Sequence, residues 1–153
     1  MSVVAPIPEG QKLFPHLIVR GAAQAIDFYV RAFGAEETLR LDMPGGKVGH
    51  AELSFAGVGI MLADEFPEMD CLSPQARGGT TMSTAVYVAD VDAFVARAIA
   101  AGAKLQRPIK DEFYGDRVAW LEDPFGHRWS FHTRREIVSP AEMKARMAAS
   151  ACD

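Results

Sequence analysis

The sequence predicts an α+β fold made of two copies of one supersecondary unit, each with the order strand, helix and three strands. The first observation is a repeated helix pattern, because residues 25–35 and 93–103 are both amphipathic and both close with Gly-Ala. Glycine often ends a helix because it takes the left-handed conformation without steric penalty. The second observation is spacing. The apolar strand pattern at 82–88 lies 69 residues after the one at 13–19, and the helix-ending glycines are 68 residues apart. A repeat of this length is typical of a duplicated unit that cannot bury its apolar face alone.

The first half contains one complete unit. Pro44-Gly45-Gly46 marks a turn and Ala56-Gly57 marks another, with alternating apolar residues between them. The expected elements are a strand at 13–19, a helix at 22–33, and strands at 36–41, 48–55 and 58–63.

The second half repeats this order. Asp90 is a candidate cap for its helix, because an aspartate side chain accepts hydrogen bonds from the free N–H groups at a helix start. Asp123-Pro124-Phe125-Gly126 has the composition of a hairpin turn. The expected elements are a strand at 82–88, a helix at 91–101, and strands at 104–109, 116–121 and 127–133.

The chain is expected to be a single domain with short extensions. Ser139-Pro140-Ala141-Glu142 combines the cap, the first-turn proline and the acid of a helix start. The expected organisation is an irregular lead-in at 1–12, one domain at 13–138 (module one at about 13–63, a linker at 64–81, module two at about 82–133), and a C-terminal helix and tail at 139–153.

Composition excludes several classes of protein. The 153 residues are 49% hydrophobic, which is enough for one domain with a core. The formal net charge of -4 and the lack of a basic run argue against nucleic acid as a partner. No apolar stretch reaches the roughly 18 residues of a membrane span, and the N-terminus has no secretory pattern. Cys71 and Cys152 form no metal or disulfide motif. We therefore expect a cytoplasmic protein without membrane or nucleic-acid partners.

Several short motifs together resemble one protein family. They are Ile26-Asp27-Phe28-Tyr29, Phe33-Gly34-Ala35, His50-Ala51-Glu52-Leu53, Met61-Leu62-Ala63-Asp64-Glu65, Phe113-Tyr114-Gly115-Asp116-Arg117, Asp123-Pro124-Phe125-Gly126-His127 and Ser139-Pro140-Ala141-Glu142-Met143. With the paired modules, they resemble the glyoxalase/bleomycin resistance protein/dioxygenase (vicinal oxygen chelate) superfamily, and its PhnB-like branch in particular, over roughly residues 13–147. The resemblance implies two modules that form an open barrel around a cleft, small-molecule binding, and a homodimer. Because this fold supports many chemistries, the resemblance does not name a reaction.

Metal-using members of this superfamily place ligands at four symmetric strand positions, two in each module. The resemblance carries these positions to Phe14, Met61, Ser83 and Ser130, and both pairs keep the offset of 69. Divalent metals are usually held by imidazole, carboxylate or thiolate groups, and none of these four side chains supplies one. We therefore expect no metal and no other cofactor at the family's site.

Two histidines leave an alternative open. Strand alternation places His16 on the face of Phe14 and His132 on the face of Ser130, so both would point into the cleft. They are either hydrogen-bonding groups of the pocket, which we favour, or ligands of a displaced site. In the second case they would join Glu52 in holding a divalent metal such as Zn, Ni, Mn or Fe.

Three further side chains are candidates for contacting a ligand. Arg117 has the charge to bind an anionic group, Tyr114 can donate a hydrogen bond or stack, and Trp120 can form an aromatic wall. The alternatives are surface pairing for Arg117 and core packing for Trp120. No spacing of Ser, His and Asp residues nominates a nucleophilic site. The candidate ligand-binding residues are Phe14, His16, Met61, Tyr114, Arg117, Trp120, Ser130 and His132.

The first functional hypothesis is a metal-free, homodimeric protein with a mostly apolar cleft that binds a small organic molecule and sequesters a toxic compound. The alternative is a metal-dependent lyase, thiol transferase or dioxygenase of the same superfamily that uses the displaced ligands. A third hypothesis is a metal-independent enzyme with Tyr114 or a histidine as acid or base. The sequence leaves open whether there is catalysis, and it identifies neither a catalytic residue nor the ligand.

Overall fold

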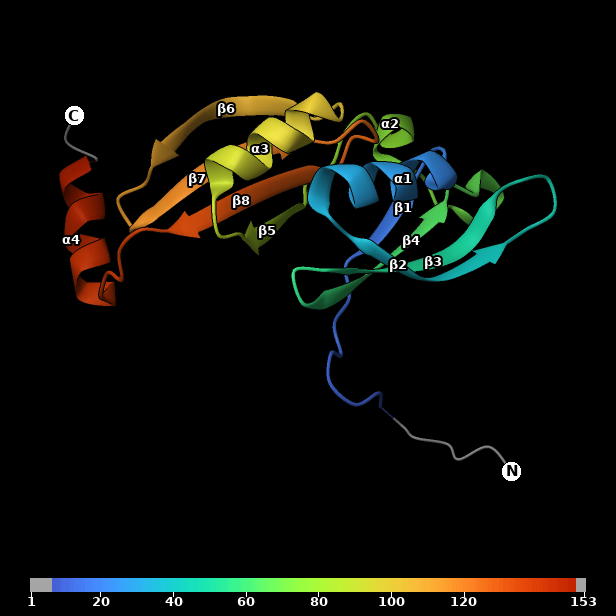
Figure 1. The fold of residues 1–153 in the computed structure, drawn as a ribbon, viewed down its shortest axis with the longest axis horizontal. Coiled ribbons are helices and arrows are strands. Elements are labelled where there is room, and N and C mark those ends of the chain that lie inside the picture. Colours follow the sequence, from blue (N-terminus) through green and yellow to red (C-terminus); the bar gives the residue numbers. More distant parts are fainter. Residues whose placement is uncertain (1–6, 151–153) are drawn as a thin grey trace. The chain divides into compact units, whose positions relative to one another are not determined.

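Both halves of the chain contain the predicted order of strand, helix and three strands (Figure 1). The computed structural model describes residues 7–150, so the first six residues of the expected lead-in and the last three of the expected tail lie outside it. The chain divides into two compact units, Met1–Gly78 and Gly79–Asp153. No helix in the described part is both long enough and apolar enough to span a membrane.

The first unit is a four-stranded sheet with one long helix. Its elements are β1 (His16–Val19), α1 (Ala22–Phe33), β2 (Glu36–Asp42), β3 (Val48–Phe55), β4 (Val58–Asp64), the 3-10 helix η1 (Pro67–Met69) and the short α2 (Pro74–Arg77). The strand order is β1-β4-β3-β2. β1 is parallel to β4, and the other neighbours are antiparallel.

The apolar stripe of α1 supplies the core of the first unit. Phe28 and Phe33 meet edge to face with ring centroids 5.4 Å apart, and Phe33 stacks on Phe55 of β3 at 5.4 Å. Gly34 ends the helix at a φ of 71°, a conformation that its lack of a Cβ permits. The helix therefore covers one face of the sheet, and its apolar side chains are removed from water there.

The second unit repeats this arrangement. Asp90 caps its helix as predicted, because its Oδ1 accepts a hydrogen bond from the N–H of Ala93 at 3.0 Å. The strand order is β5-β8-β7-β6, with β5 parallel to β8. Both four-stranded sheets are open rather than closed barrels. The elements are β5 (Ser83–Tyr87), α3 (Val91–Ala100), β6 (Lys104–Asp111), β7 (Asp116–Glu122), β8 (Arg128–Arg134) and α4 (Pro140–Ser150).

A buried aspartate holds the hairpin between β7 and β8. Asp123 is 3% exposed, and its Oδ1 accepts hydrogen bonds from the N–H groups of Phe125 at 2.9 Å and His127 at 3.0 Å. Its Oδ2 accepts a third bond, from the indole Nε1 of Trp129, at 2.9 Å. These bonds compensate for the removal of the carboxylate from water. The Asp-Pro-Phe-Gly-His motif is therefore a turn that its first residue holds together.

Two segments differ from the expected elements by more than two residues. β1 begins at His16, because Pro15 has no N–H and joins the ladder only through its carbonyl, which accepts from the N–H of Met61 at 2.9 Å. The expected linker at 64–81 contains the end of β4, η1 and α2. Ser73 caps α2, since its Oγ accepts from the N–H of Ala76 at 3.3 Å.

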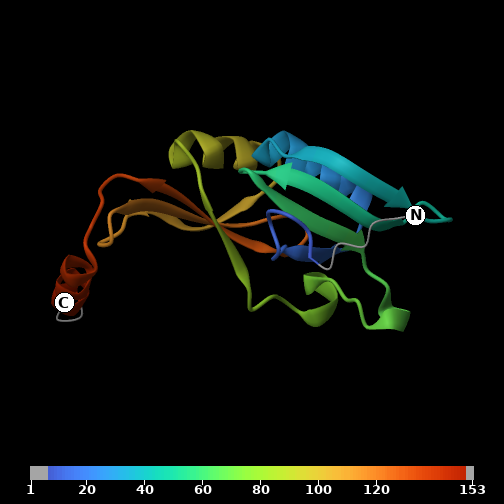
Figure 2. The same cartoon turned by 90° about the horizontal axis from the view of Figure 1, so that it is seen from below.

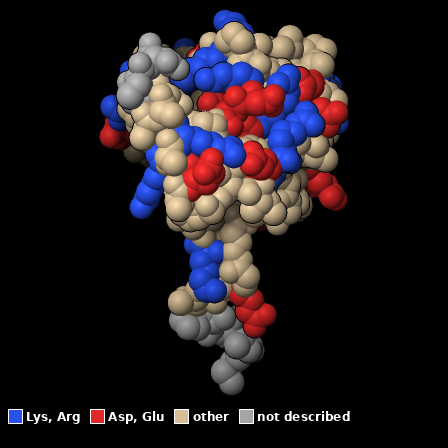
Figure 3. Space-filling view, turned by 90° about the vertical axis from the view of Figure 1, so that its left-hand side faces the viewer, with Lys and Arg blue, Asp and Glu red and all other residues tan. Residues whose placement is uncertain are grey.

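The C-terminal helix α4 lies beyond one end of the second sheet (Figures 1 and 2). None of residues 140–150 is buried. Arg146 attaches the helix, because its guanidinium donates to both carboxylate oxygens of Glu136 at 2.9 Å, to Glu142 at 2.8 Å and to the carbonyl of Phe113 at 3.1 Å. Figure 3 views the molecule from this side and shows acidic and basic side chains interspersed.

Candidate functional site

The sheet of the first unit has one face packed against α1 and one face that α1 does not cover. Asp64 of β4 faces α1, because its Oδ1 accepts hydrogen bonds from the N–H groups of Gly21 at 3.0 Å and Ala22 at 2.9 Å. Side chains alternate along a strand, so Met61 and Ala63 lie on the opposite face. We call this the open face of the first sheet, and it also carries His16, Ile18, His50 and Glu52.

Three ionisable side chains lie together on this open face. The strand pairing places His16 beside Met61, and Met61 beside Glu52. The rings of His16 and His50 meet edge to face with centroids 6.2 Å apart, and His50 Nε2 lies 3.2 Å from Glu52 Oε1. Partial burial, and then the neighbouring His50, lower the pKa of His16. His16 is therefore a neutral imidazole at neutral pH, which can donate one hydrogen bond and accept another.

A pocket of about 350 Å³ lies over this open face. Its lining is mainly apolar and comes from the sheet and from the segment after β4. Figure 2 shows this segment, in green, on the side of the sheet away from α1. Pockets of this size, with apolar walls and a few polar groups, are typical of small-molecule sites. The lining includes His16, Ile18, Ala63, Phe66, Met69 and Cys71.

One glutamate anchors the segment that forms the pocket wall. Glu65 Oε2 accepts hydrogen bonds from the Oγ of Ser73 at 2.6 Å and from its N–H at 3.1 Å, while Oε1 accepts from Arg20 Nε at 2.7 Å. The Ser73 hydroxyl, and then Arg20, lower the pKa of Glu65 to about 2. Between these anchors, Phe66 and Cys71 pair as an isolated bridge. The wall is therefore held at both ends rather than left as a loose linker.

Phe14 also lies on the open face of the first sheet. Its ring covers Gly59, where an added Cβ would come within 2.8 Å of a ring carbon. The amide nitrogen of Gln11 donates to the carbonyl of Gly59 at 2.9 Å and holds this stretch against β4. Gly59 and Met61 have the same orientation in the strand. Three of the candidate residues, Phe14, His16 and Met61, therefore share one face of the first unit.

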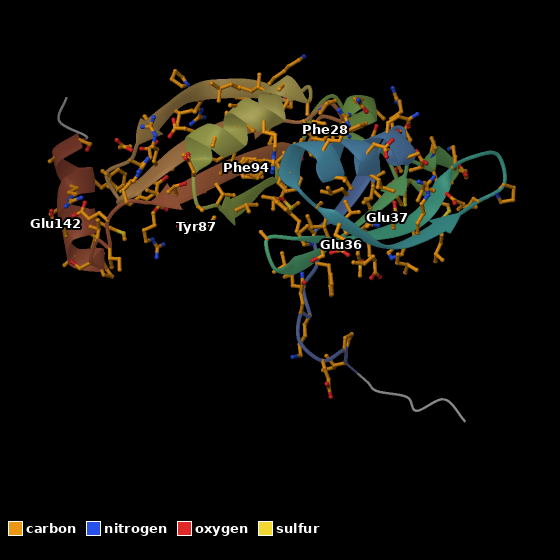
Figure 4. The ribbon with its side chains drawn as sticks, viewed as in Figure 1. Phe28, Glu36, Glu37, Tyr87, Phe94 and Glu142 are labelled. Carbon is orange, nitrogen blue, oxygen red and sulfur yellow. The ribbon has the colours of Figure 1, made fainter. Side chains whose placement is uncertain are left out.

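The second sheet likewise has an open face, which points away from α3. Phe131 of β8 faces α3, because its ring centroid lies 4.4 Å from that of Phe94. Its neighbours Ser130 and His132 therefore point the other way. Figure 4 shows Phe94 beneath α3 and Tyr87 on the opposite side of the sheet. Two more of the candidate residues thus share a face, here in the second unit.

Trp120 is half-buried on the open face of the second sheet, beside Ser130 in the pairing of β7 with β8. The guanidinium carbons of Arg107 and Arg128 lie 5.4 Å and 5.7 Å from its ring centroid. Both distances are within the range of a cation–π contact. Trp120 is therefore a side chain of the sheet surface rather than of the core beneath α3.

Arg117 does not share this face, which corrects the expectation that it contacts a ligand and agrees with the alternative of surface pairing. Its Nε and Nη2 donate to both carboxylate oxygens of Asp92 on α3, at 2.7 Å and 2.9 Å. Asp111 lies 3.4 Å from Nη1. The reason is strand parity, because an odd separation along β7 places Arg117 and Trp120 on opposite faces. Hydrogen bonding to Asp92 also raises the pKa of Arg117, and the pair attaches α3 to the sheet.

Tyr114 lies in the turn between β6 and β7, half-buried, with its ring edge-on to Phe113 at 5.2 Å. Burial, and then the charges of Glu112 and Asp116, raise its pKa. It is therefore a protonated hydroxyl at neutral pH and can serve as a hydrogen-bond donor.

The structure brings together a serine, a histidine and an aspartate that sequence spacing did not nominate. Ser130 Oγ lies 3.0 Å from His132 Nε2, and His132 Nδ1 lies 3.4 Å from Asp116 Oδ2. The first two residues are at alternate positions of β8, but Asp116 comes from β7. Only the pairing of these strands, which places Asp116 opposite Arg134, makes the contact. The Ser-x-His spacing was the one signal of it in the sequence.

The resemblance described above assigns the metal positions of the superfamily to two side chains in each unit. Phe14 and Met61 offer a phenyl ring and a thioether, and Ser83 and Ser130 offer neutral hydroxyls, which do not fit a divalent metal. Among residues 7–150, no group of three His, Cys, Asp or Glu side chains is arranged to hold a metal ion. Of the displaced ligands considered above, His16 and Glu52 belong to the first unit and His132 to the second.

Comparison with known proteins gives the same family as the motifs. The family model described as the Glyoxalase/Bleomycin resistance protein/Dioxygenase superfamily matches residues 13–131. An uncharacterized protein of Mycobacterium tuberculosis is 42% identical over 139 residues, which cover 89% of this chain and 82% of that protein.

Two solved structures share the fold. TioX from Micromonospora sp. ML1 is 31% identical, with a TM-score of 0.66 over 82% of this chain and 99% of that one. The fosfomycin resistance protein FosX from Listeria monocytogenes, solved with Mn(II) and sulfate, is 20% identical, with a TM-score of 0.64 over 92% of this chain and 99% of that one. At 20% identity the second likeness concerns the fold alone. From the family match, the relatives and the two βαβββ units, we conclude that this chain belongs to the glyoxalase/bleomycin resistance protein/dioxygenase superfamily.

Proposed function

We propose that this chain binds a small, largely apolar organic molecule in the pocket of the first unit and acts by sequestering it. The observation that carries the proposal is the pocket of about 350 Å³ with its mainly apolar lining. Burial of apolar ligand surface supplies about 25 cal/mol for each Å² removed from water. Membership of a superfamily whose description includes bleomycin resistance proteins supports a protective role.

The lining indicates the chemistry of the ligand. Phe66 and Ile18 offer aromatic and aliphatic surface, and Met69 is an adaptable side chain at the exposed rim, where it is 69% exposed. His16 is the neutral polar group of the sheet side of the pocket. The favoured ligand is therefore a ring-bearing molecule with one hydrogen-bonding group that meets the His16 imidazole.

We propose further that this binding requires no divalent metal. The argument is the donor chemistry at the family's four positions, where Phe14, Met61, Ser83 and Ser130 replace imidazoles and carboxylates. His16, which lies beside Met61 in the sheet and lines the pocket, then bonds the ligand directly. Affinity should depend on shape and apolar burial rather than on the polarising charge of an ion.

Titration with 8-anilino-1-naphthalenesulfonate, whose fluorescence rises in apolar sites, tests the proposal. We expect one saturable site per chain, and the same affinity after dialysis against EDTA. Ala63→Phe places a ring in the pocket and should weaken binding at least about tenfold, or about 1.4 kcal/mol. Ser54→Phe is the matched control, because Ser54 is an exposed residue of the same face outside the pocket.

Three results would contradict this function. Equal affinity of the Ala63→Phe and Ser54→Phe variants would show that the probe does not use the pocket. Loss of binding in EDTA would replace the metal-free site with a metal site. Turnover of methylglyoxal and glutathione that EDTA abolishes would favour a metal-dependent lyase instead.

We propose that the protein is a homodimer. Several apolar side chains are exposed on its surface, among them Leu41 of β2 at 53% and Met147 of α4 at 62%. A two-fold contact between identical surfaces is the commonest way to bury such side chains. Light scattering should give the mass of a dimer at micromolar concentration, and a monomer mass at that and higher concentrations would overturn the proposal.

A further inference from the structure

A buried carboxylate stands behind the Ser130–His132 pair on the second sheet. Asp116 is 2% exposed and its Oδ2 accepts a hydrogen bond from the hydroxyl of Tyr87 at 2.6 Å. Arg134 Nε lies 3.5 Å from Oδ1, and Arg134 Nη2 donates to the Tyr87 hydroxyl at 3.1 Å. A buried carboxylate is retained where such donors compensate for its lost hydration. Tyr87 and Arg134 thus keep Asp116 in place beside His132.

The contacts of His132 indicate which ring nitrogen carries the proton. Nδ1 is buried, makes no hydrogen bond within the described structure, and faces the Asp116 carboxylate at 3.4 Å. A buried polar nitrogen without a partner is costly, so a proton on Nδ1 that closes toward Asp116 is the favourable assignment. Nε2 then carries the lone pair and faces Ser130 Oγ at 3.0 Å. His132 is thereby oriented as a base toward the Ser130 hydroxyl.

We propose that Ser130 is a nucleophile activated by His132, with Asp116 as the positioning residue, and that its substrates are small activated esters. The order nucleophile, base and orienting carboxylate recurs on unrelated folds because it depends on geometry rather than on chain order. Such contacts are often longer in an unliganded protein than during reaction. Ser130 is 2% exposed, which favours small acyl groups such as acetyl.

The reaction balances with water as the only co-reactant. Ser130 Oγ attacks the carbonyl carbon of the ester while its proton passes to His132 Nε2. The bond between the carbonyl carbon and the leaving oxygen breaks. The leaving group either takes the proton from His132 or departs as an anion such as p-nitrophenolate, in which case His132 releases that proton to water. Water then attacks the acyl-serine, gives a proton to His132, and releases the carboxylic acid as Ser130 regains its hydrogen.

Acetylation by p-nitrophenyl acetate tests the site directly. We expect a burst of one p-nitrophenolate per chain and a mass increase of one acetyl group, which peptide mapping places on Ser130. Ser130→Ala should abolish the burst. Ser83→Ala is the matched control, because Ser83 is an exposed serine of the same sheet, in β5.

Two further variants separate the base from a structural role. His132→Gln should slow acetylation at least about 100-fold, since general base catalysis typically contributes 10²–10⁴-fold. His127→Gln, in the hairpin turn, should not. For Asp116→Asn, the ¹⁵N chemical shifts of the His132 ring are the readout, and they should change from the Nδ1–H form of the wild type to a mixture of the two neutral forms.

Several outcomes would overturn this inference. Acetyl groups on lysines but not on Ser130, or an unchanged rate in His132→Gln, would exclude a base-activated serine. An Nε2–H form of His132 in the wild type would also contradict it. The location of the acetyl group and the histidine spectrum are measured on the wild-type chain, so both remain decisive if a variant fails to fold.

Discussion

Asp64 and Thr133 occupy the same place in the two units and hold the two helices in the same way. Asp64 Oδ1 accepts a hydrogen bond from the N–H of Ala22 at 2.9 Å, and Thr133 Oγ1 accepts one from the N–H of Val91 at 2.8 Å. The acceptors are 69 residues apart, and so are the donors. Each acceptor lies in the last strand of its unit and satisfies a free N–H group at a helix start. The duplication seen in the sequence thus extends to this polar contact, which is present once in each unit.

The two acceptors should differ in how much they stabilise the protein. Asp64→Ala leaves the N–H groups of Gly21, Ala22 and Val48 without their acceptor, because Oδ2 also accepts from Val48 at 2.8 Å. At about 1–3 kcal/mol for each unsatisfied buried donor, with some relaxation, we expect the free energy of unfolding to fall by about 3–5 kcal/mol. Urea unfolding measures this loss.

Thr133→Val is the milder member of the pair. It keeps the shape of the side chain but removes the hydroxyl that accepts from Val91 and donates to the carbonyl of Val88 at 2.9 Å. We expect a loss of about 1–3 kcal/mol. Losses of the same size for both variants would show that the additional bonds of Asp64 contribute nothing.

Gly115 should be intolerant of any side chain. Its φ of +98° is unfavourable for other residues, and an added Cβ would overlap the carbonyl oxygen of Glu136 and lie 2.9 Å from Cγ2 of Val138. Gly45, with a φ of +87°, has no described atom within 4 Å of its added Cβ. We expect Gly45→Ala to cost only the backbone strain of about 1–2 kcal/mol. Gly115→Ala should lower the free energy of unfolding by more than that. A higher melting temperature for Gly115→Ala than for Gly45→Ala would contradict this prediction.

His16 should titrate below its ordinary pKa, and His50 should account for the smaller part of the shift. Burial is the larger cause, and the charge of His50 is the second. Removing that charge in His50→Ala should therefore raise the pKa of His16 but leave it below the ordinary value of 6.5. NMR titration of the imidazole protons measures the pKa of His16 in the wild type and in the variant. His127→Ala is the control and should leave this pKa unchanged. A His16 pKa at or above 6.5 in the wild type would contradict the effect assigned to burial.

Glu65 should make the protein sensitive to acid. Its pKa is lowered from 4.5 to about 2, so its ionised form is favoured in the folded state. The stability that it contributes is present above about pH 4.5 and is lost as the pH falls toward about 2. Thermal melts across this range should show a shallower decline for Glu65→Gln than for the wild type. The exposed neighbour Glu68, changed to Gln, should leave the decline as it is.

Local features of the fold could be predicted because the interactions that make them are close in sequence. The Asp90 cap bonds a residue three positions later, and the Asp123 turn closes within six residues. The 69-residue offset required only a comparison of the chain with itself. The same motifs were specific enough to identify the superfamily.

The misplacement of Arg117 shows where sequence reasoning failed. Alternation along β7 already implied that Arg117 and Trp120 point to opposite faces. Alternation could not show which of the two faces α3 would cover. That depends on how the helix packs on the sheet, and the helix residue that Arg117 contacts, Asp92, is 25 residues away in sequence.

By itself, the sequence determined the duplicated α+β fold, with its turns and caps, and the superfamily. Only the tertiary structure decided what surrounds the candidate residues. The pocket exists because Glu65 holds the segment after β4 over the open face of the first sheet. Ser130, His132 and Asp116 lie in contact because β7 and β8 pair in the register that places Asp116 opposite Arg134. The pocket and the Ser130–His132–Asp116 contacts each join segments that are separate in the sequence, and a periodic pattern within one segment does not indicate its partner. The free energy of packing brings these segments together, rather than the secondary-structure preference of each one.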